Sequence, residues 1–510
     1  MGHCLKKLEN YLAKHAVPTF RDKPSPVNLN FYDTICILII SFISIVVHFW
    51  AFYKPYNIVS IEITNQFLNN QNNFSQNSFS QPLGNIIFSF LTAISRNDDG
   101  CNTYNNYECK DEFFFNDFSS SLQNNYQKNQ FFNFLNEDNQ ITMRAISSLF
   151  SSFVPPLLYI SIKLASFSRI CASLSSLLLI FDTSILCEGK FSHPSGFLHF
   201  FVSLSLCFLT YWFSLFRNND LWNKNMIFSS ISIGIAVSIK SSACFLLFIV
   251  YFHEFIYLFI ENNSKLSNQF MKSVLKRYAF FTFPVIVIHI LFYLLQLILT
   301  IHHFNYKSRN FQSISKQNSL FLTFRLILTN CVLSKTKDFT QLKTIKTKSN
   351  HTLSPTNWIF ISKLDDNLWI KCNQKEECER VVFIGNLFVY IFAFFGVIIV
   401  ILAKSNRKYF RSSTFYLGYI FSFLPYLILS KCHFDLNSSD YLIPLMFGVS
   451  CFGISIDVIA ARPLKGFLFV IALTFTIFGF NMWAPLVFAE KLGKHNFNLR
   501  VWKKAWLDTI

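Results

Sequence analysis

The stretch Ile58-Val-Ser-Ile-Glu-Ile-Thr-Asn65 lies in a polar segment, residues 55–142, between the first two hydrophobic runs of the chain. Its carboxylate, Glu62, closely follows the first run. The segment also contains the turn Ser80-Gln-Pro-Leu-Gly-Asn85, and at its end Ile141-Thr-Met-Arg144 places a cation at the start of the second run. A carboxylate and a guanidinium at the same membrane face suit a site for an anionic, lipid-linked substrate.

The composition is that of a polytopic membrane protein. Of the 510 residues, 52% are hydrophobic and only 14% are charged, which excludes an ordinary soluble domain. The net charge of +17 does not require nucleic acid, because Lys and Arg gather in short loops between hydrophobic runs, as the positive-inside rule expects. The thirteen cysteines form no CxxC pair and show no zinc spacing.

The hydrophobic runs predict an all-α protein with about eleven transmembrane helices, each near the ~20 residues that cross a bilayer. The basic residues that precede the first run predict a cytosolic N-terminus, and because residues 1–33 contain no apolar h-region we expect no cleavable signal peptide. The predicted spans are residues 34–53, 143–165, 170–187, 197–215, two within 226–260, 280–301, 381–403, 415–429, 441–460 and 467–488.

These spans divide the chain into five parts. We expect a cytosolic tail (1–33), an N-terminal transmembrane module (34–301) that includes the lumenal loop 55–142, a second lumenal loop (302–379), a C-terminal transmembrane module (380–488) and a lumenal tail (489–510).

Three charged residues at span ends are candidates for chemistry, since charges near a span usually have a function or a partner. Glu62 suits a general base, a ligand for a divalent ion or a solvated loop carboxylate. Arg144 suits a phosphate contact or a side chain that snorkels to the interface. Lys240 lies at a predicted lumenal turn, where it suits a second phosphate contact or an anchor.

Other polar residues give weaker indications. His433 and Asp435 are too few ligands to predict a metal site, and we predict none. Cys372 with Cys378, and Cys101 with Cys109, fall in predicted lumenal loops and have spacings that allow disulfides in an oxidising compartment.

Several stretches, in order along the chain, resemble the protein O-mannosyltransferase family. The closest is Gly234-Ile-Ala-Val-Ser-Ile-Lys240, which resembles the family's Gly-Leu-Ala-Val-Ser-Val-Lys. Further stretches that resemble family motifs are Pro55 to Glu62, Ser80 to Asn85, Thr142 to Phe150, Asp182 to Ser184, Lys190-Phe191, Ser354 to Trp358, Leu424-Pro425, Tyr441 to Pro444 and Trp502 to Asp508.

The resemblance implies a C-type glycosyltransferase fold in the endoplasmic reticulum membrane, with the N-terminus cytosolic and the C-terminus lumenal. It implies transfer of mannose from dolichyl phosphate mannose to Ser or Thr hydroxyls of acceptor proteins. Glu62 would then be the catalytic residue, Arg144 and Lys240 would bind the phosphate, and Ser80 and Asn85 would occupy acceptor or turn positions. The use of a divalent cation is left open.

The chain also departs from the family pattern. The family's Asp is Ile61 here, and the His and Lys of its turn are Ser80 and Asn85. The loop 302–379 is too short for the tandem MIR domain of many members. Three alternatives therefore stay open: an impaired member that forms a dimer with an active paralogue, a transferase that uses another dolichol-phosphate sugar, and a transporter. The transporter is disfavoured because no internal repeat is visible. Whether the chain forms a homodimer or a heterodimer is also open.

Overall fold

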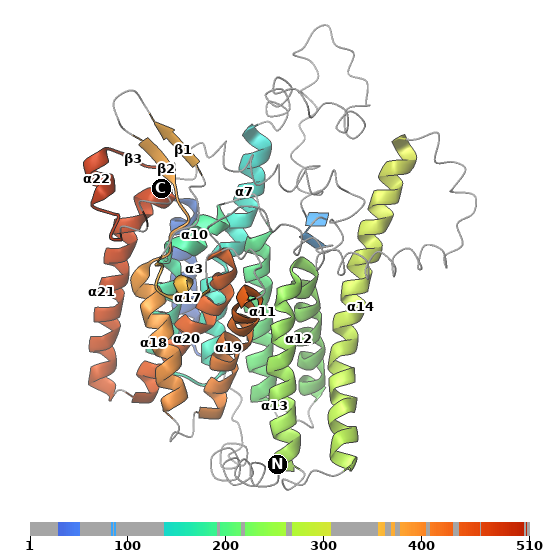
Figure 1. Cartoon of the computed structure of the whole chain (residues 1–510). Coiled ribbons are helices and arrows are strands. Elements are labelled where there is room, and N and C mark those ends of the chain that lie inside the picture. The colour runs from blue at the N-terminus through green and yellow to red at the C-terminus, as the bar shows by residue number, and fades with distance from the viewer. Residues whose placement is uncertain are drawn as a thin grey trace.

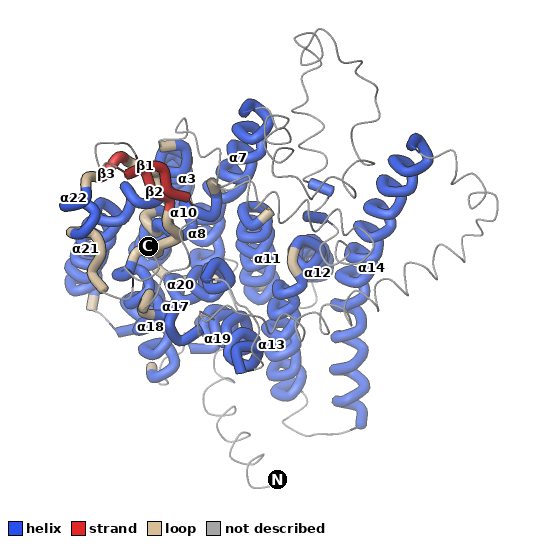
Figure 2. The backbone as a smooth tube through the Cα atoms, turned by 45° about the horizontal axis from the view of Figure 1, so that its top comes forward, coloured by secondary structure: helices blue, strands red, loops and turns tan. Residues whose placement is uncertain are grey.

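The computed structural model describes residues 29–50, 83–84, 86–87, 137–190, 194–215, 220–261, 268–307, 355–362, 369–372, 378–403, 409–431, 438–459, 461–503 and 506. Within them the long helices run side by side as one bundle, with a small sheet at one end (Figures 1 and 2). The predicted polytopic α-helical fold is confirmed.

The first half of the bundle contains α3 (Phe31–Phe49), α7 (Glu137–Ser152), α8 (Val154–Leu164), α9 (Arg169–Ile180), α10 (Thr183–Gly189), α11 (Ser195–Ser214), α12 (Asp220–Ile239), the 3-10 turn η4 (Ser241–Cys244), α13 (Phe245–Glu261) and α14 (Asn268–Lys307). The second half contains α17 (Pro355–Ile359), α18 (Leu387–Leu402), α19 (Tyr409–Lys431), η6 (Ser438–Tyr441), α20 (Leu442–Ile459), α21 (Arg462–Val487) and α22 (Lys494–Asn498).

Each of the eleven predicted spans corresponds to a helix or a pair of helices in the described part of the chain. By length and composition, eight of the described helices could cross a membrane, and nine could if the bent pair α9–α10 is one span. The helix α14 is longer than predicted. Its 40 residues extend about 60 Å at 1.5 Å per residue, which exceeds the ~30 Å hydrocarbon core.

Two predicted spans are not single straight helices. The second is divided at Phe153, since Pro155 and Pro156 lie in the first turn of α8, where a missing backbone N–H costs least. The third bends by 59° between α9 and α10, at Phe181 and Asp182.

The core lies around α20, whose span is 83% buried, whereas the spans of α3, α14 and α21 are largely exposed at the outside of the bundle. Close helix packing at α20 depends on a small residue. A Cβ at Gly396 of α18 would collide with the backbone of Phe452 on α20, so only glycine permits this approach.

A three-stranded antiparallel sheet was not predicted from the sequence. Its strands are β1 (Trp369–Cys372), β2 (Cys378–Val381) and β3 (Lys491–Leu492), in the order β1-β2-β3. It joins the second predicted lumenal loop to the predicted lumenal tail. Cys372 and Cys378 are directly opposite in the register, and their disulfide stays a prediction. Cys101 and Cys109 lie outside the described residues.

Ion pairs and a hydrogen bond join helices near the predicted cytosolic ends of the spans, two of these contacts over more than 100 residues. Asp33, at the start of α3, accepts a hydrogen bond from Arg169 Nε at 2.8 Å and lies 3.7 Å from Lys163 Nζ. On α20, Asp457 accepts from Lys465 Nζ at 2.6 Å and from the backbone N–H of Ser168 at 3.3 Å. Residues predicted on one side of the membrane are therefore found together.

Candidate functional site

Arg144 lies on the face of α7 that packs against α3 and α10. Its side chain is only 2% exposed, and its Nε donates to the carbonyl oxygen of Lys190 at 3.2 Å. One turn further along α7, Ser148 Oγ donates to the carbonyl of Gly189 at 3.0 Å. The last carbonyls of a helix lack partners within that helix, so α7 supplies donors to the C-terminal end of α10. This contact orients the plane of the guanidinium, which has five N–H donors in all.

Lys190 brings a second cation to the same end of α10. Its ammonium donates to the carbonyl of Trp50 at 2.8 Å and lies 3.7 Å from the ring centroid of Phe488. The side chain is buried. Arg144 and Lys190 thus hold two positive charges at the C-terminal end of α10.

Lys240 occupies the break between α12 and η4. Its backbone is extended, with φ −148° and ψ 125°, and this conformation separates α12 from α13. Its ammonium pairs with the Asp440 carboxylate of η6 at 2.5 Å. The Lys240 side chain is 33% exposed and that of Asp440 is 13% exposed, so the cation keeps access to a ligand.

The pKa of Lys240 is held above its usual value. Burial alone would lower this pKa, but the charge of Asp440 more than offsets burial, and Tyr426 and Glu188 act in the same direction. Lys240 is therefore protonated at any physiological pH. The influence of Glu188, in the last turn of α10, also places Lys240 within electrostatic reach of the segment that Arg144 contacts.

Glu188 and Asp440 were not identified from the sequence. Both lie at the ends of apolar runs on the predicted lumenal side, the same side as Lys240. The sequence could have indicated them, because a cation at the lumenal end of a span usually pairs with a carboxylate on the same side of the membrane. The described part of the site therefore combines three cations with two carboxylates.

Asp182 supports α10 from the other end. Asp182 is the N-cap of α10: its Oδ2 accepts a hydrogen bond from the backbone N–H of Ile185 at 3.1 Å. The same oxygen accepts a second hydrogen bond from the Ser184 hydroxyl. Its Oδ1 accepts from the backbone N–H of Asn386 at 3.0 Å. Asp182 thereby positions the short helix that carries Glu188 and ends at the carbonyl bound by Arg144.

The other predicted site residues, Glu62, Ser80 and Asn85, lie outside the described residues. Within the turn that contains Ser80 and Asn85, Leu83 is described and is buried in the main hydrophobic core. His433 and Asp435 also lie outside the described residues. Among the described side chains, no group of three or more His, Cys, Asp or Glu could hold a metal ion.

Comparison with known proteins gives a family match, a curated relative and similar solved structures. A family model described as dolichyl-phosphate-mannose-protein mannosyltransferase matches residues 118–305. Dolichyl-phosphate-mannose–protein mannosyltransferase 1 of Schizosaccharomyces pombe is 23% identical over 236 residues, which are 44% of this chain. The chain thus spans only 23% of the length of that curated relative.

The likeness in structure is more extensive. The protein O-mannosyltransferase Pmt1-Pmt2 complex of S. cerevisiae, bound to the sugar donor, has a chain with a TM-score of 0.69 at 10% identity, covering 94% of this chain and 93% of that one. The archaeal oligosaccharyltransferase AglB of Archaeoglobus fulgidus gives a TM-score of 0.44 at 11% identity, covering 91% and 56%.

Proposed function

We propose that this chain is a member of the dolichyl-phosphate-mannose-protein mannosyltransferase family and that it transfers mannose from dolichyl phosphate mannose to Ser or Thr hydroxyls of proteins in the lumen of the endoplasmic reticulum. One observation carries the proposal: the matched segment 118–305 contains three buried or half-buried cations, of which Arg144 and Lys190 meet at the C-terminal end of α10 and Lys240 pairs with Asp440 at the break after α12.

The reaction requires positive charge at the donor phosphate. The acceptor hydroxyl oxygen bonds to C1 of mannose, the bond from C1 to the phosphate oxygen breaks, and dolichyl phosphate leaves. The phosphate group passes from a singly charged diester to a doubly charged monoester. Fixed cations that face this developing charge lower the barrier, because they need no reorganisation as the charge forms.

Lys240 and Arg144 take different parts in this scheme. Lys240 is the more exposed cation, so it contacts the leaving phosphate directly while Asp440 holds it in place. Arg144 is buried and bound through Nε to the carbonyl of Lys190, so its positive charge is held in a fixed position at the end of α10.

The hydroxyl proton of the acceptor needs a base. We assign this role to Glu62, in the lumenal loop 55–142, and the acceptor or turn positions to Ser80 and Asn85. A divalent cation near the phosphate is compatible with the scheme and is not required by it.

The membrane arrangement follows from the same scheme. The chain is a multi-pass membrane protein, and we place it in the endoplasmic reticulum with its N-terminus in the cytosol and its C-terminus in the lumen. The similar yeast proteins form a Pmt1-Pmt2 complex, which supports a dimer with a paralogue for this chain as well.

A second candidate function is that of a partner subunit. The observation that favours it is Ile61, an apolar residue where the family pattern has Asp. In this case the fold and the lipid-phosphate contacts would be retained while a paralogue performs the transfer.

Mannose transfer to a Ser/Thr peptide, measured with the purified full-length chain alone and with a paralogue, separates the two candidates. We expect activity from the chain alone, and a loss of about 10²- to 10³-fold in kcat for Lys240→Ala or Arg144→Ala, the usual cost of one transition-state donor. Lys272→Ala is the matched control, since Lys272 is an exposed lysine of α14, outside these contacts.

Glu62→Ala decides the assignment of the base. If the chain is the enzyme, mannose transfer by Glu62→Ala should fall as it does for Lys240→Ala and Arg144→Ala. Transfer that appears only with a paralogue and is unchanged by Glu62→Ala identifies a partner subunit. No transfer in any pairing refutes both candidates.

A further inference from the structure

A cavity lies at the ends of α12 and α13 that are far from Lys240. The cavity, of about 590 Å³ and open on one side, is lined by the C-terminal part of α11, the first half of α12, the second half of α13 and the first half of α14. Its volume falls within the usual range for ligand pockets, roughly 300–1,000 Å³. It is independent of the proposed transferase site.

The separation of the two sites follows from helix geometry. Lys240 lies after the last residue of α12, and Asn223, which lines the cavity, is 17 residues earlier. At 1.5 Å per residue this is about 25 Å along the helix. Glu254 on α13, also in the lining, is 14 residues after Lys240, or about 21 Å. The cavity therefore lies near the membrane face that the positive-inside rule assigns to the cytosol.

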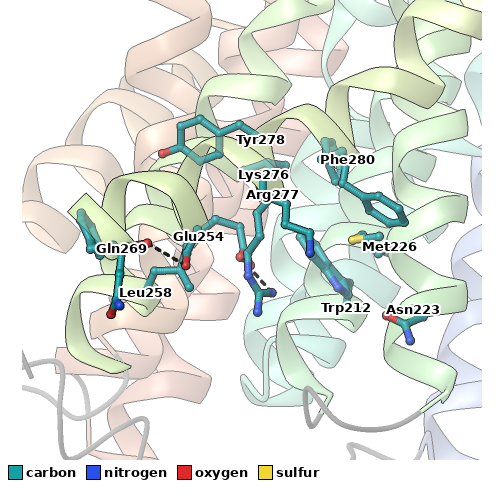
Figure 3. Close-up of a pocket in the computed structure, with 14 residues that line it drawn as sticks. Trp212, Asn223, Met226, Glu254, Leu258, Gln269, Lys276, Arg277, Tyr278 and Phe280 are labelled. Carbon is teal, nitrogen blue, oxygen red and sulfur yellow. Dashed lines mark hydrogen bonds and ion pairs between the residues drawn. The ribbon is translucent and has the colours of Figure 1, made fainter. Parts of the chain in front are cut away.

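The lining combines cations with an apolar wall. Lys276 and Arg277 of α14 lie between Glu254 and Trp212 (Figure 3). Arg277 Nη1 is 3.7 Å from the buried Glu254 carboxylate, and Lys276 is exposed at the rim. Two cations against one carboxylate leave the lining with a net positive charge. A guanidinium with five N–H donors can pair with Glu254 and still bond to a phosphate.

The cavity also borders the lipid-facing surface. Phe280, in its lining, is 58% exposed, and the span of α14 that follows is largely exposed and apolar. Cations at the edge of an apolar helix surface lie at headgroup level in a bilayer. The cytosolic leaflet carries the anionic lipids, which attract basic groups at that surface.

We propose that this cavity binds the headgroup of an anionic glycerophospholipid from the cytosolic leaflet. Its phosphate lies against Lys276 and Arg277, and the first carbons of its tails lie against Phe280 and Phe281. The same chemistry would recognise a free phosphate, which the experiment distinguishes.

The test uses native mass spectrometry of the full-length protein in detergent, titrated with phosphatidylserine. Lys276→Glu should weaken binding at least tenfold, because it reverses one of two cations at the headgroup. Lys272→Glu is the matched control: it changes the same charge on an exposed lysine one turn away that does not line the cavity. Ser273→Trp fills the cavity from an exposed lining position with every cation intact, and it should also weaken binding.

Three results would overturn the proposal. One is equal weakening by Lys272→Glu and Lys276→Glu, which would indicate general surface charge. Another is equal binding of diacylglycerol, which lacks the phosphate. The third is displacement of phosphatidylserine by millimolar inorganic phosphate, which would identify a free-phosphate site.

Discussion

Asp182 stabilises the fold and also positions α10, the short helix at the candidate site. Its two carboxylate oxygens serve different elements: Oδ2 caps α10 through Ile185, and Oδ1 accepts the backbone N–H of Asn386, 204 residues away. Asn386 is fully buried, and its side-chain amide donates to the carbonyls of Phe181 and Thr476, so its backbone cannot turn toward water.

The cost of each substitution follows from these bonds. Asp182→Ala removes the cap, worth about 1 kcal/mol, and leaves the buried N–H of Asn386 unsatisfied, worth about 1–3 kcal/mol. We expect a total near 3 kcal/mol, which changes the ratio of folded to unfolded protein more than 100-fold. Asp182→Asn keeps an oxygen that can cap α10, but its amide N–H₂ then faces the backbone N–H of Asn386, which is also a donor. We therefore expect this variant to lose about 2 kcal/mol of stability.

The apparent melting temperature, measured by size-exclusion chromatography of heated detergent extracts, tests whether Asp182→Ala is less stable than Asp182→Asn. Thr183→Val is the neighbouring control, because it removes a single donor to the Ile384 carbonyl and should cost about 1 kcal/mol. Mannose transfer should fall with Asp182→Ala, since α10 carries the carbonyl that holds Arg144. If Asp182→Asn destabilises the protein as much as Asp182→Ala, the capping argument is wrong.

Two further predictions concern helix packing and are measured by the same melting assay. Asp33→Ala should cost about 1–3 kcal/mol, because it leaves the buried hydroxyl of Tyr159, which donates to Asp33 Oδ1 at 3.0 Å, without an acceptor. Arg169→Ala removes a side chain that is 40% exposed and should cost far less; equal shifts would contradict this reasoning. Gly196→Ala should destabilise by about 1–3 kcal/mol, because its Cβ would lie 2.5 Å from the carbonyl oxygen of Ser147. Gly466→Ala, with open space around its Cβ, should have no such cost, and the packing argument fails if the two variants behave alike.

The positions of the helices were predictable because each span is a long apolar run between charged loops. The bends were not. Residues 170–187 carry no charge except Asp182, and the 59° bend lies where Asp182 accepts a hydrogen bond from the backbone N–H of Asn386, a contact that the local sequence does not reveal. The sheet escaped notice because its strands have four, four and two residues, too short for an alternating pattern to be recognised.

The candidate site was predictable only in part. Arg144 and Lys240 were identified because a cation at a span end is unusual enough to need an explanation. Asp440 was missed because its pairing with Lys240 joins residues 200 positions apart. Glu188 was missed because it ends an apolar run and has no motif of its own. The assignment of Glu62 still rests on the sequence alone.

The pairing of charges gives a physical test of the topology. Two side chains can form an ion pair only if they lie on the same membrane face, which requires an even number of crossings between them. Four predicted spans separate Lys240 from Asp440, and two separate Asp33 from Arg169. A single miscounted span between either pair would have placed its members about 30 Å apart, on opposite faces. The same parity places Lys240, a proposed phosphate contact, at one face and the basic cavity of α14 at the other, so each can be tested without disturbing the other.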